Sequence, residues 1–396
     1  MRRAGPSRNA ALFHDPRRFL RLSKQKAMKL LFVASEICTP VTEGRKRFII
    51  DLLEALYEAD QAALLTTRVA GQSLACSVPT WAGECRWPAE HLLSLRMGLP
   101  KILQRFEADA VFHFPYGTFH SIYGPANRWI IRAVDKMCGQ RKVPCATVMY
   151  SIDRPMTLEG LKATASCVIP VTHAADEALA LPLGINDSGW PSVPYKENAS
   201  SLLFMAGMWQ AKKERVDHVL HLRGLGTLLR AGATLGKAGI RLVVASPVFE
   251  NSGMKDYVLH HPLNRWPVGH LELRGAVKIP DVYHEAALYV FPYQHAIHQF
   301  TPTSVIEAMM AGTAVVMSDL PFLRHLAQGG SMAYLFPPGD EEALAGAVLK
   351  ALGDPVGRRV RGQEAGKYAQ SQWSIQASAE KTRRIAQSLK AREKGS

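Results

Sequence analysis

Two hydroxyl residues and a glutamate one turn further on form the most chemically suggestive group in the chain. Thr303, Ser304 and Glu307 share the start of one expected helix within the stretch Tyr289–Asp319. The free N–H groups and partial positive charge of a helix N-terminus favour a bound phosphate. A carboxylate at Glu307 has the acceptor oxygens to take two hydrogen bonds from a ribose diol. The spacing therefore fits a sugar nucleotide.

The residues around this group predict a strand, a loop, a helix and a second strand. The first strand covers 287–291 and ends at a proline, which cannot continue a central strand. We expect the helix over 303–311, ended by a glycine, and the next strand over 313–317. The hydroxyl residues expected to cap this helix are Thr301, Thr303 or Ser304.

The same stretch resembles the donor-site signature of retaining family-4 glycosyltransferases with the GT-B fold. Residues 307–316 read EAMMAGTAVV, where the family has E-A-M-A-x-G-x-P-V-V. Gln299 stands where the family has a first glutamate that contacts the donor sugar. The resemblance implies that Glu307 holds ribose and that Gln299 touches the sugar. It also implies that Thr303 and Ser304 hold phosphate.

Two segments of the N-terminal half also resemble the family. Glu43-Gly44 stands where the family has a Gly-Gly pair that lets the backbone approach the donor phosphate, so Gly44 is a predicted contact. His113-Phe114-Pro115 resembles the family's H-E-P, whose His reaches the donor sugar near the reacting carbon. His113 is the predicted catalytic histidine, although a lone His at a strand end is as often structural.

The start of the expected second domain carries the cations of the family pattern in altered form. After a strand over 202–206, the family has G-R and then K-G, whose Arg and Lys hold the donor diphosphate. Here Gly207 is followed by Met208, and the K-G match falls at Arg223-Gly224 beyond an inserted charged stretch. Arg223 is therefore the predicted phosphate-binding cation, because guanidinium binds phosphate well. The alternative cations are Lys212 and Lys213, and all three also fit solvated surface charges.

Strands and helices alternate along the chain, including an expected strand over 271–277 and a later helix capped by Asp340. This alternation predicts parallel sheets covered on both faces. A length of 396 residues allows two sizeable cores. The resemblance implies an α/β fold of the GT-B type, with two Rossmann-like domains whose parallel sheets face each other across a cleft. The expected divisions are a basic, disordered extension (1–27), an acceptor-side domain (28–186), a linker (187–200), a nucleotide-sugar domain (201–372) and a C-terminal helix packing back toward the first domain (373–396).

The net charge of +14 is concentrated at the N-terminus, where residues 1–27 hold eight Lys or Arg and one acidic residue. This pattern fits a disordered extension, a transit peptide, or contact with an anionic membrane at about 1 kcal/mol per basic residue. Charge alone also allows nucleic acid, but no basic motif interleaved with aromatics supports that partner. We therefore expect no nucleic-acid binding.

The remaining composition indicates a cytoplasmic protein, peripheral at most to the inner face of a membrane. Six cysteines are scattered without a C-x-x-C pair, which favours free thiols in a reducing compartment. No apolar run reaches the 18 or so residues of a membrane span. There is no P-loop and no Asp-x-Asp motif. We expect no metal and no cofactor, the nucleoside-diphosphate sugar being a donor substrate.

The resemblance implies transfer of a sugar from a nucleoside diphosphate to a hydroxyl of a glycan, lipid or small molecule. The anomeric configuration of the sugar would be retained. The implied role is in the synthesis of cell-envelope polysaccharide. The protein would then position the substrates and stabilise charge on the leaving diphosphate. The loss of the first glutamate keeps a second hypothesis open, a degenerate GT-B protein that binds a nucleotide sugar or a partner without turnover. A sugar-nucleotide epimerase fits the donor half less well.

Overall fold

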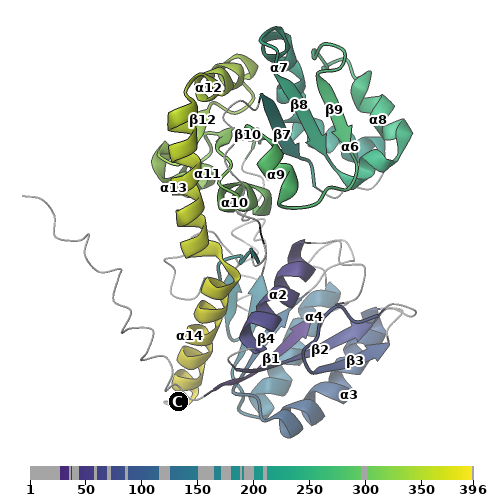
Figure 1. The fold of residues 1–396 in the computed structure, drawn as a ribbon. Coiled ribbons are helices and arrows are strands. Elements are labelled where there is room, and N and C mark those ends of the chain that lie inside the picture. Colours follow the sequence, from purple (N-terminus) through teal and green to yellow (C-terminus); the bar gives the residue numbers. More distant parts are fainter. Residues whose placement is uncertain are drawn as a thin grey trace, which may run out of the picture.

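Two α/β domains make up the fold, one above the other in Figure 1, with the C-terminal helices running along one side of both. The structure is a computed structural model. It describes residues 27–34, 37, 44–57, 60–68, 73–84, 88–115, 125–149, 165–170, 180–187, 190, 200–207, 212–295 and 302–394. The expected α/β class with two parallel sheets is confirmed.

The N-terminal domain is built on a six-stranded parallel sheet of order β3-β2-β1-β4-β5-β6. Its strands are β1 (Lys29–Ala34), β2 (Gln61–Arg68), β3 (Thr80–Glu84), β4 (Ala110–Phe114), β5 (Cys145–Met149) and β6 (Val168–Pro170). The chain adds strands outward from β1 in one direction and outward from β4 in the other. The carboxyl ends of these two neighbours therefore form the switch point at which doubly wound sheets bind ligands.

Helices cover both faces of this sheet, because each face of a parallel sheet is apolar. The covering helices are α2 (Gly44–Tyr57), α3 (Pro88–Phe106), α4 (Pro125–Gln140) and α14 (Ile375–Lys394). Phe32 and Phe112 point toward α2 and α14 in one cluster of buried side chains. Val33 and Val111, which adjoin these phenylalanines in the two strands, point toward α3 and α4 in another.

The C-terminal domain repeats this topology. The strands are β7 (Ser201–Met205), β8 (Arg241–Ala245), β9 (Leu271–Arg274), β10 (Leu288–Phe291), β11 (Val315–Ser318) and β12 (Tyr334–Phe336). They form a six-stranded parallel sheet of order β12-β11-β10-β7-β8-β9. The second switch point therefore lies at the carboxyl ends of β7 and β10.

The helices of this domain also divide between two faces. They are α6 (Lys213–His221), α7 (Leu225–Lys237), α8 (Ser252–Leu259), α9 (Asp281–Glu285), α10 (Thr303–Met310), α11 (Pro321–Leu326), α12 (Glu341–Gly353) and α13 (Pro355–Trp373), with short 3-10 turns η1 (Pro247–Glu250) and η2 (Gln328–Gly330). Side chains of α6, α7 and α12 share one buried cluster, and those of α10, α11 and α13 share another. The expected cap of α12 is confirmed, because Asp340 accepts from the N–H of Ala343 at 2.8 Å.

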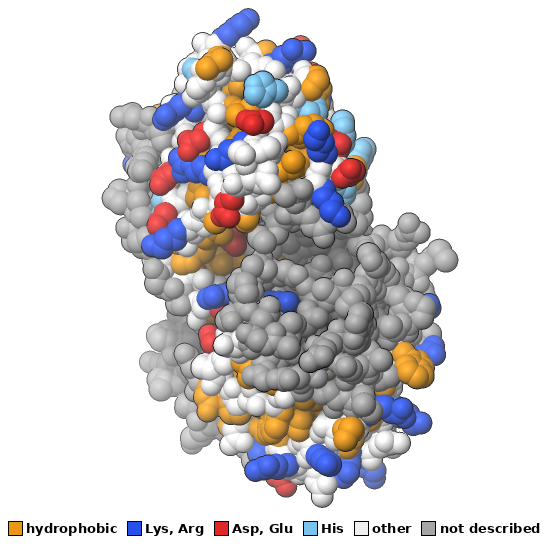
Figure 2. All heavy atoms as spheres, turned by 90° about the vertical axis from the view of Figure 1, so that its right-hand side faces the viewer, with side chains coloured by type: hydrophobic (Ala, Val, Ile, Leu, Met, Phe, Trp, Pro, Cys, Tyr) orange, Lys and Arg blue, Asp and Glu red, His pale blue; other side chains and the backbone are white. Residues whose placement is uncertain are grey.

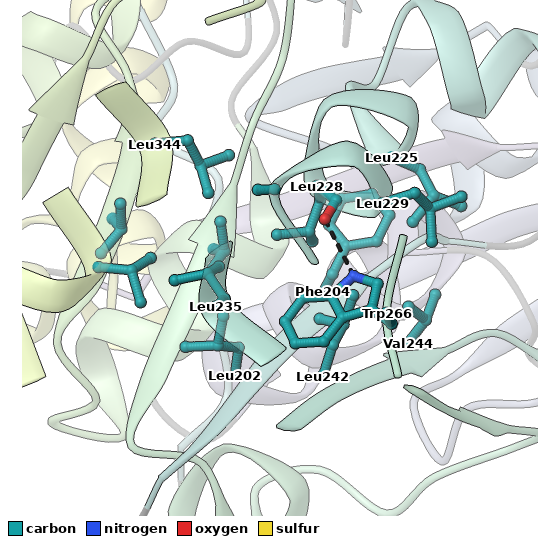
Figure 3. Close-up of a cluster of buried hydrophobic side chains, with 14 of the residues drawn as sticks. Leu202, Phe204, Leu225, Leu228, Leu229, Leu235, Leu242, Val244, Trp266 and Leu344 are labelled. Carbon is teal, nitrogen blue, oxygen red and sulfur yellow. Dashed lines mark hydrogen bonds between the residues drawn. The ribbon is translucent and has the colours of Figure 1, made fainter. Parts of the chain in front are cut away.

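Figure 3 shows the first of these clusters around Trp266. The indole N–H of Trp266 donates to the carbonyl of Leu228 at 3.1 Å, so the ring is buried without an unpaired polar atom. Gly232 makes room for this ring, because a β-carbon there would lie 2.5 Å from it. Helix α7 thus lies close against the segment before β9.

The C-terminal helices connect the two domains. Helix α13 packs on α10 through Gly362, where a β-carbon would lie 2.2 Å from the carbonyl of Gly312. Ser374 has extended backbone, which ends α13 and starts α14. Helix α14 then packs on α2 of the other domain, as Figure 1 shows. Among the described residues no helix is both long and apolar enough to cross a membrane.

Several expected boundaries were wrong. The strand expected over 271–277 ends at Arg274, and the strand expected over 313–317 runs instead from Val315 to Ser318. The inserted charged stretch after Gly207 contains helix α6. Residues 61–106, which had no expected elements, hold two strands and a long helix.

Candidate active site

Helix α10 begins beside the switch point of the C-terminal sheet, twelve residues after the end of β10. Its N-cap residue is Pro302, with no side-chain cap. The expected hydroxyl caps at Thr303 and Ser304 were therefore wrong, and Thr301 lies outside the described residues. The Ser304 hydroxyl instead accepts from the phenol of Tyr289 at 2.7 Å. Among the described residues no side chain caps this end of α10, and the N–H groups of such a first turn favour an anion.

Glu307 carries a half-buried carboxylate one turn into α10. The phenol of Tyr283, from α9, donates to Glu307 Oε2 at 2.9 Å and lies 3.1 Å from the carbonyl oxygen of Ser304. Burial raises the pKa of Glu307 to about 7, although the hydrogen bond from Tyr283 acts in the opposite direction. Burial and the nearby carboxylate raise the pKa of Tyr283 well above its usual value, so the phenol stays a donor.

A cavity of about 320 Å³ lies between the two domains and includes Glu307 in its wall. Its lining residues are Arg47, Phe48, Asp51, Leu183, Gly184, Ile185, Asn186, Trp190, Ile279, Thr303 and Glu307. The first turns of two helices, α2 and α10, therefore contribute to one cavity. Each helix N-terminus favours an anion, so the pair suits a diphosphate better than either would alone.

The wall contributed by the N-terminal domain contains a second carboxylate. Asp51 is only 4 % exposed. Its Oδ2 accepts from the guanidinium of Arg47 at 3.0 Å and its Oδ1 from the amide of Asn186 at 3.4 Å. These partners satisfy a buried charge that would otherwise be costly. The cavity thus has a hydrogen-bonded carboxylate on each side.

Arg223 lies at the carboxyl end of β7 and is not among the described residues that line this cavity. Its guanidinium donates to the carbonyl of Ala206 at 2.9 Å. Its positive charge also acts on Tyr293, opposing the rise in the pKa of that phenol caused by burial. Lys213, one of the alternative cations, lies over the ring of Tyr257 at 5.4 Å, and Lys212 is exposed. Of the three cations, Arg223 is the one held at the switch point.

Two glycines shape the backbone at the same sheet edge. Gly207 has a φ of 77°, and its carbonyl accepts from the Ser246 hydroxyl at 2.7 Å. Gly224 is the N-cap of α7 with a φ of 74°. A β-carbon on Gly224 would lie 1.6 Å from the carbonyl oxygen of Pro292. Only glycine lets the start of α7 approach the end of β10 this closely.

The remaining predicted site residues, Gly44, His113 and Gln299, are not among the described residues that line the cavity. Gly44 is the first residue of α2, one turn before Arg47. His113 is 2 % exposed in β4, and alternation along the strand puts it on the α3–α4 face with Val111. Gln299 lies outside the described residues, so its role stays a prediction.

Sequence reasoning missed Asp51, Asn186 and Tyr283. Asp51 gave one signal, since it interrupts an otherwise apolar run in the first helix, FIIDLL. Tyr283 gave none, because it reaches Glu307 from a short helix 24 positions earlier. Within the described part of the chain, no three His, Cys, Asp or Glu side chains are grouped so that they could hold a metal.

The C-terminal domain matches a known protein family. Residues 202–354 match the family described as glycosyl transferases group 1. A segment of 76 residues is 42% identical to the phosphatidyl-myo-inositol mannosyltransferase of Mycobacterium leprae (strain TN). That alignment covers 19% of this chain and only 20% of the mannosyltransferase.

Solved structures match over nearly the whole chain. Sucrose-phosphate synthase from Thermosynechococcus elongatus superposes with a TM-score of 0.67 at 17% identity, covering 92% of this chain and 100% of that one. Anabaena Alr3699/HepE, in complex with UDP and glucose, superposes with a TM-score of 0.64 at 14% identity, covering 91% and 99%. The expected GT-B fold is confirmed by these likenesses.

Proposed function

Residues 202–354 match the glycosyl transferases group 1 family, and on that premise we propose that the protein transfers a sugar from a nucleoside diphosphate to an acceptor hydroxyl. The observation that carries the proposal is the cavity between the domains, in which Glu307 and the first turn of α10 share a wall. The carboxylate would accept from the ribose diol, and the helix N-terminus would hold the diphosphate.

The reaction proposed is a single exchange of bonds at the anomeric carbon. The acceptor oxygen forms a bond to that carbon, and the bond from the carbon to the diphosphate oxygen breaks. The acceptor proton passes to the leaving diphosphate, so no separate protein base is needed. Arg223 and the N-terminus of α10 would stabilise the negative charge that develops there. We propose retention of configuration by resemblance to family 4, and Gln299 and His113 as the contacts to the donor sugar.

The acceptor side is proposed to be the N-terminal domain. Arg47 and Asp51 face the cavity from α2 and offer both charges to an acceptor hydroxyl of a glycan or lipid. The mannosyltransferase with the matching segment is named for a phosphatidylinositol acceptor. We further propose action in cell-envelope synthesis on the cytoplasmic side of a membrane.

A thermal-shift series tests the donor site. UDP, GDP, ADP and dTDP are added separately to the wild type, to Glu307→Ala and to Glu364→Ala, an exposed glutamate on α13 that serves as the matched control. A bound nucleotide raises the free energy of unfolding by about 2.7 kcal/mol at a hundredfold excess over Kd. We expect one nucleotide to stabilise the wild type and Glu364→Ala but not Glu307→Ala. The absence of a shift with all four would contradict the donor site.

Turnover is tested separately from binding. The stabilising nucleotide is supplied as its sugar conjugate with candidate acceptors, and release of free nucleotide is followed together with the anomeric configuration of the product by NMR. Release that depends on acceptor indicates a transferase. Binding without release over all donors and acceptors tried would favour the degenerate binding protein, and isomerised donor without acceptor would indicate an epimerase.

A further inference from the structure

A groove of about 470 Å³ runs between α3 and α4 on the N-terminal domain. It lies on the opposite face of the sheet from α2 and α14. Its lining residues are Arg96, Pro100, Trp129, Arg132, Lys136 and Met137, with Ala133 and Gln140 beside them. The residues from α4 recur at spacings of three and four, so they form one continuous stripe of that helix.

Large apolar side chains are exposed on the two helices that form this groove, and one of them, Trp129, lines it. Trp129 is 64% exposed, and Met97, one turn before Pro100, is 63% exposed. Trp266 and Trp373, by contrast, are 7% and 1% exposed. A tryptophan ring in water beside a groove is therefore not typical of this protein. Such a ring, apolar with a single N–H, is suited to the boundary between membrane headgroups and acyl chains.

The same two helices and the turn after α4 are strongly basic. Their cations are Arg96, Lys101, Arg105, Arg128, Arg132, Lys136, Arg141 and Lys142. None of these forms an ion pair with any residue that the structure describes. Nearby acidic groups are engaged elsewhere, since Asp135 accepts from Ser166 and Glu107 from Lys29. Figure 2 shows Lys and Arg side chains with hydrophobic ones between them at the lower end of this domain.

We propose that this α3–α4 surface docks the protein on an anionic phospholipid membrane. Charge complementarity identifies the partner class, because unpaired cations attract acidic headgroups. The exposed Trp129 and Met97 favour a bilayer over a nucleic acid, since an apolar thioether gains nothing from a phosphate backbone but can enter the acyl boundary. The inference does not depend on the proposed glycosyl transfer, and its test contains no substrate.

The test is co-flotation of the full-length protein with vesicles. One set is phosphatidylcholine alone, and the other contains phosphatidylglycerol. We expect binding only to the second set, weakened by salt. Arg132→Glu combined with Lys136→Glu should weaken binding at least about 20-fold, because each cation near the surface contributes about fivefold and reversal adds repulsion. Trp129→Ala should weaken it about tenfold through loss of apolar burial.

Matched charge reversals on the other domain distinguish binding through the α3–α4 surface from attraction by the net charge of the whole protein. Lys237→Glu combined with Lys367→Glu changes two exposed lysines of the C-terminal domain, and we expect it to bind vesicles like the wild type. Thermal unfolding verifies that each variant is folded. Equal losses from both pairs would overturn the proposal, because attraction would then follow total charge or the basic segment 1–27. Failure of the wild type to bind vesicles, including the case in which it binds duplex DNA instead, would also overturn it.

Discussion

Glu307 combines partial burial with an incomplete set of hydrogen-bond partners, and this combination links ligand binding to protonation of the carboxylate. Its Oε2 is held by Tyr283, while its side chain also borders the cavity. With a pKa of about 7, the carboxyl of the ligand-free protein is close to half protonated at neutral pH. A ribose diol donates hydrogen bonds, which favour the ionised form. Nucleotide binding should therefore release a proton.

We expect nucleotide affinity to fall as the pH falls through 7. Only the ionised fraction of Glu307 is competent to accept both hydrogen bonds, and this fraction drops about tenfold between pH 8 and pH 6. Apparent Kd, measured by titration calorimetry, should thus be roughly tenfold higher at pH 6. In Glu307→Gln the affinity should be lower and independent of pH over this range.

Tyr283→Phe provides the companion variant for this prediction. Loss of the hydrogen bond that lowers the pKa of Glu307 should move the midpoint of the affinity profile to higher pH. A wild-type profile that is flat between pH 6 and 8 would contradict the link between Glu307 and the ligand.

At the residue scale, the sequence predicted what lies close along the chain. Thr303 and Glu307 share one helix, so spacing alone placed both on the cavity wall. Tyr283 and Asp51 could not be predicted in this way, because they meet Glu307 and Asn186 only when segments 24 and 135 positions apart fold together. Pattern matching along one stretch carries no information on such partners.

At the element scale, the approach of α7 to the end of β10 fixes the shape of the candidate site. The Gly224 backbone has left-handed geometry and touches Pro292, and Gln294 adds a hydrogen bond from its side-chain amide to Thr227 in α7 at 2.9 Å. These contacts position Arg223, which directly precedes the glycine. A change at this junction should affect both stability and nucleotide binding.

Gly224→Ala tests this junction, with Gly239→Ala as its control. Both glycines have nearly equal φ, 74° and 76°, but a β-carbon on Gly239 meets nothing within 4 Å. We expect Gly239→Ala to lower the free energy of unfolding by about 1 kcal/mol through backbone strain alone. Gly224→Ala should cost at least about 3 kcal/mol, since overpacking against the backbone adds to that strain. Urea unfolding measures both, and equal losses would contradict the role given to the contact.

The elements were predicted well where periodicity and caps agreed, as at α12 with Asp340. The start of α10 at Thr303 was predicted correctly, but its hydroxyl cap was not, because the N-cap residue is Pro302 and the Ser304 hydroxyl accepts instead from Tyr289. Expected strand ends were off by up to three residues because pairing with a neighbouring strand, and not composition, determines where a strand ends. This is seen at β9, which pairs only from Leu271 to Arg274.

At the scale of the whole molecule, helix α14 attaches the C-terminal end of the chain to the N-terminal domain through buried charge. Arg383 donates to Asp60 at 2.7 Å, and Asp60 also accepts from the N–H of Met28 at 2.9 Å. Lys390 pairs with Asp109, which accepts in turn from the N–H of Lys29. The helix therefore fixes the start of β1 from a distance of more than 300 residues along the chain.

Asp60→Ala should destabilise the protein by about 3 kcal/mol, because Arg383 would keep a partly buried charge without its partner. Arg384→Ala is the control on the same helix. Its exposed pair with Glu380 should contribute less than about 1 kcal/mol. Chemical unfolding gives the two values, and limited proteolysis should release α14 faster only in the Asp60 variant. Equal effects of the two substitutions would contradict this attachment.

The two chain segments that pass between the domains meet at one point. The N–H of Ile185 donates to the carbonyl of Trp373 at 2.7 Å, and the N–H of Ile375 donates to the carbonyl of Ile185 at 2.9 Å. This single parallel bridge, between Ile185 and Ser374, resists sliding of the two segments but would allow one domain to turn against the other about this point. Displacement in a rotation grows with distance from its axis. Ile185 also lines the cavity. The part of the cavity wall beside Ile185 would therefore stay almost still during such a rotation, while the part farthest from it opened and closed. A ligand would be admitted or enclosed by movement of the far wall, without disturbance of the residues beside Ile185.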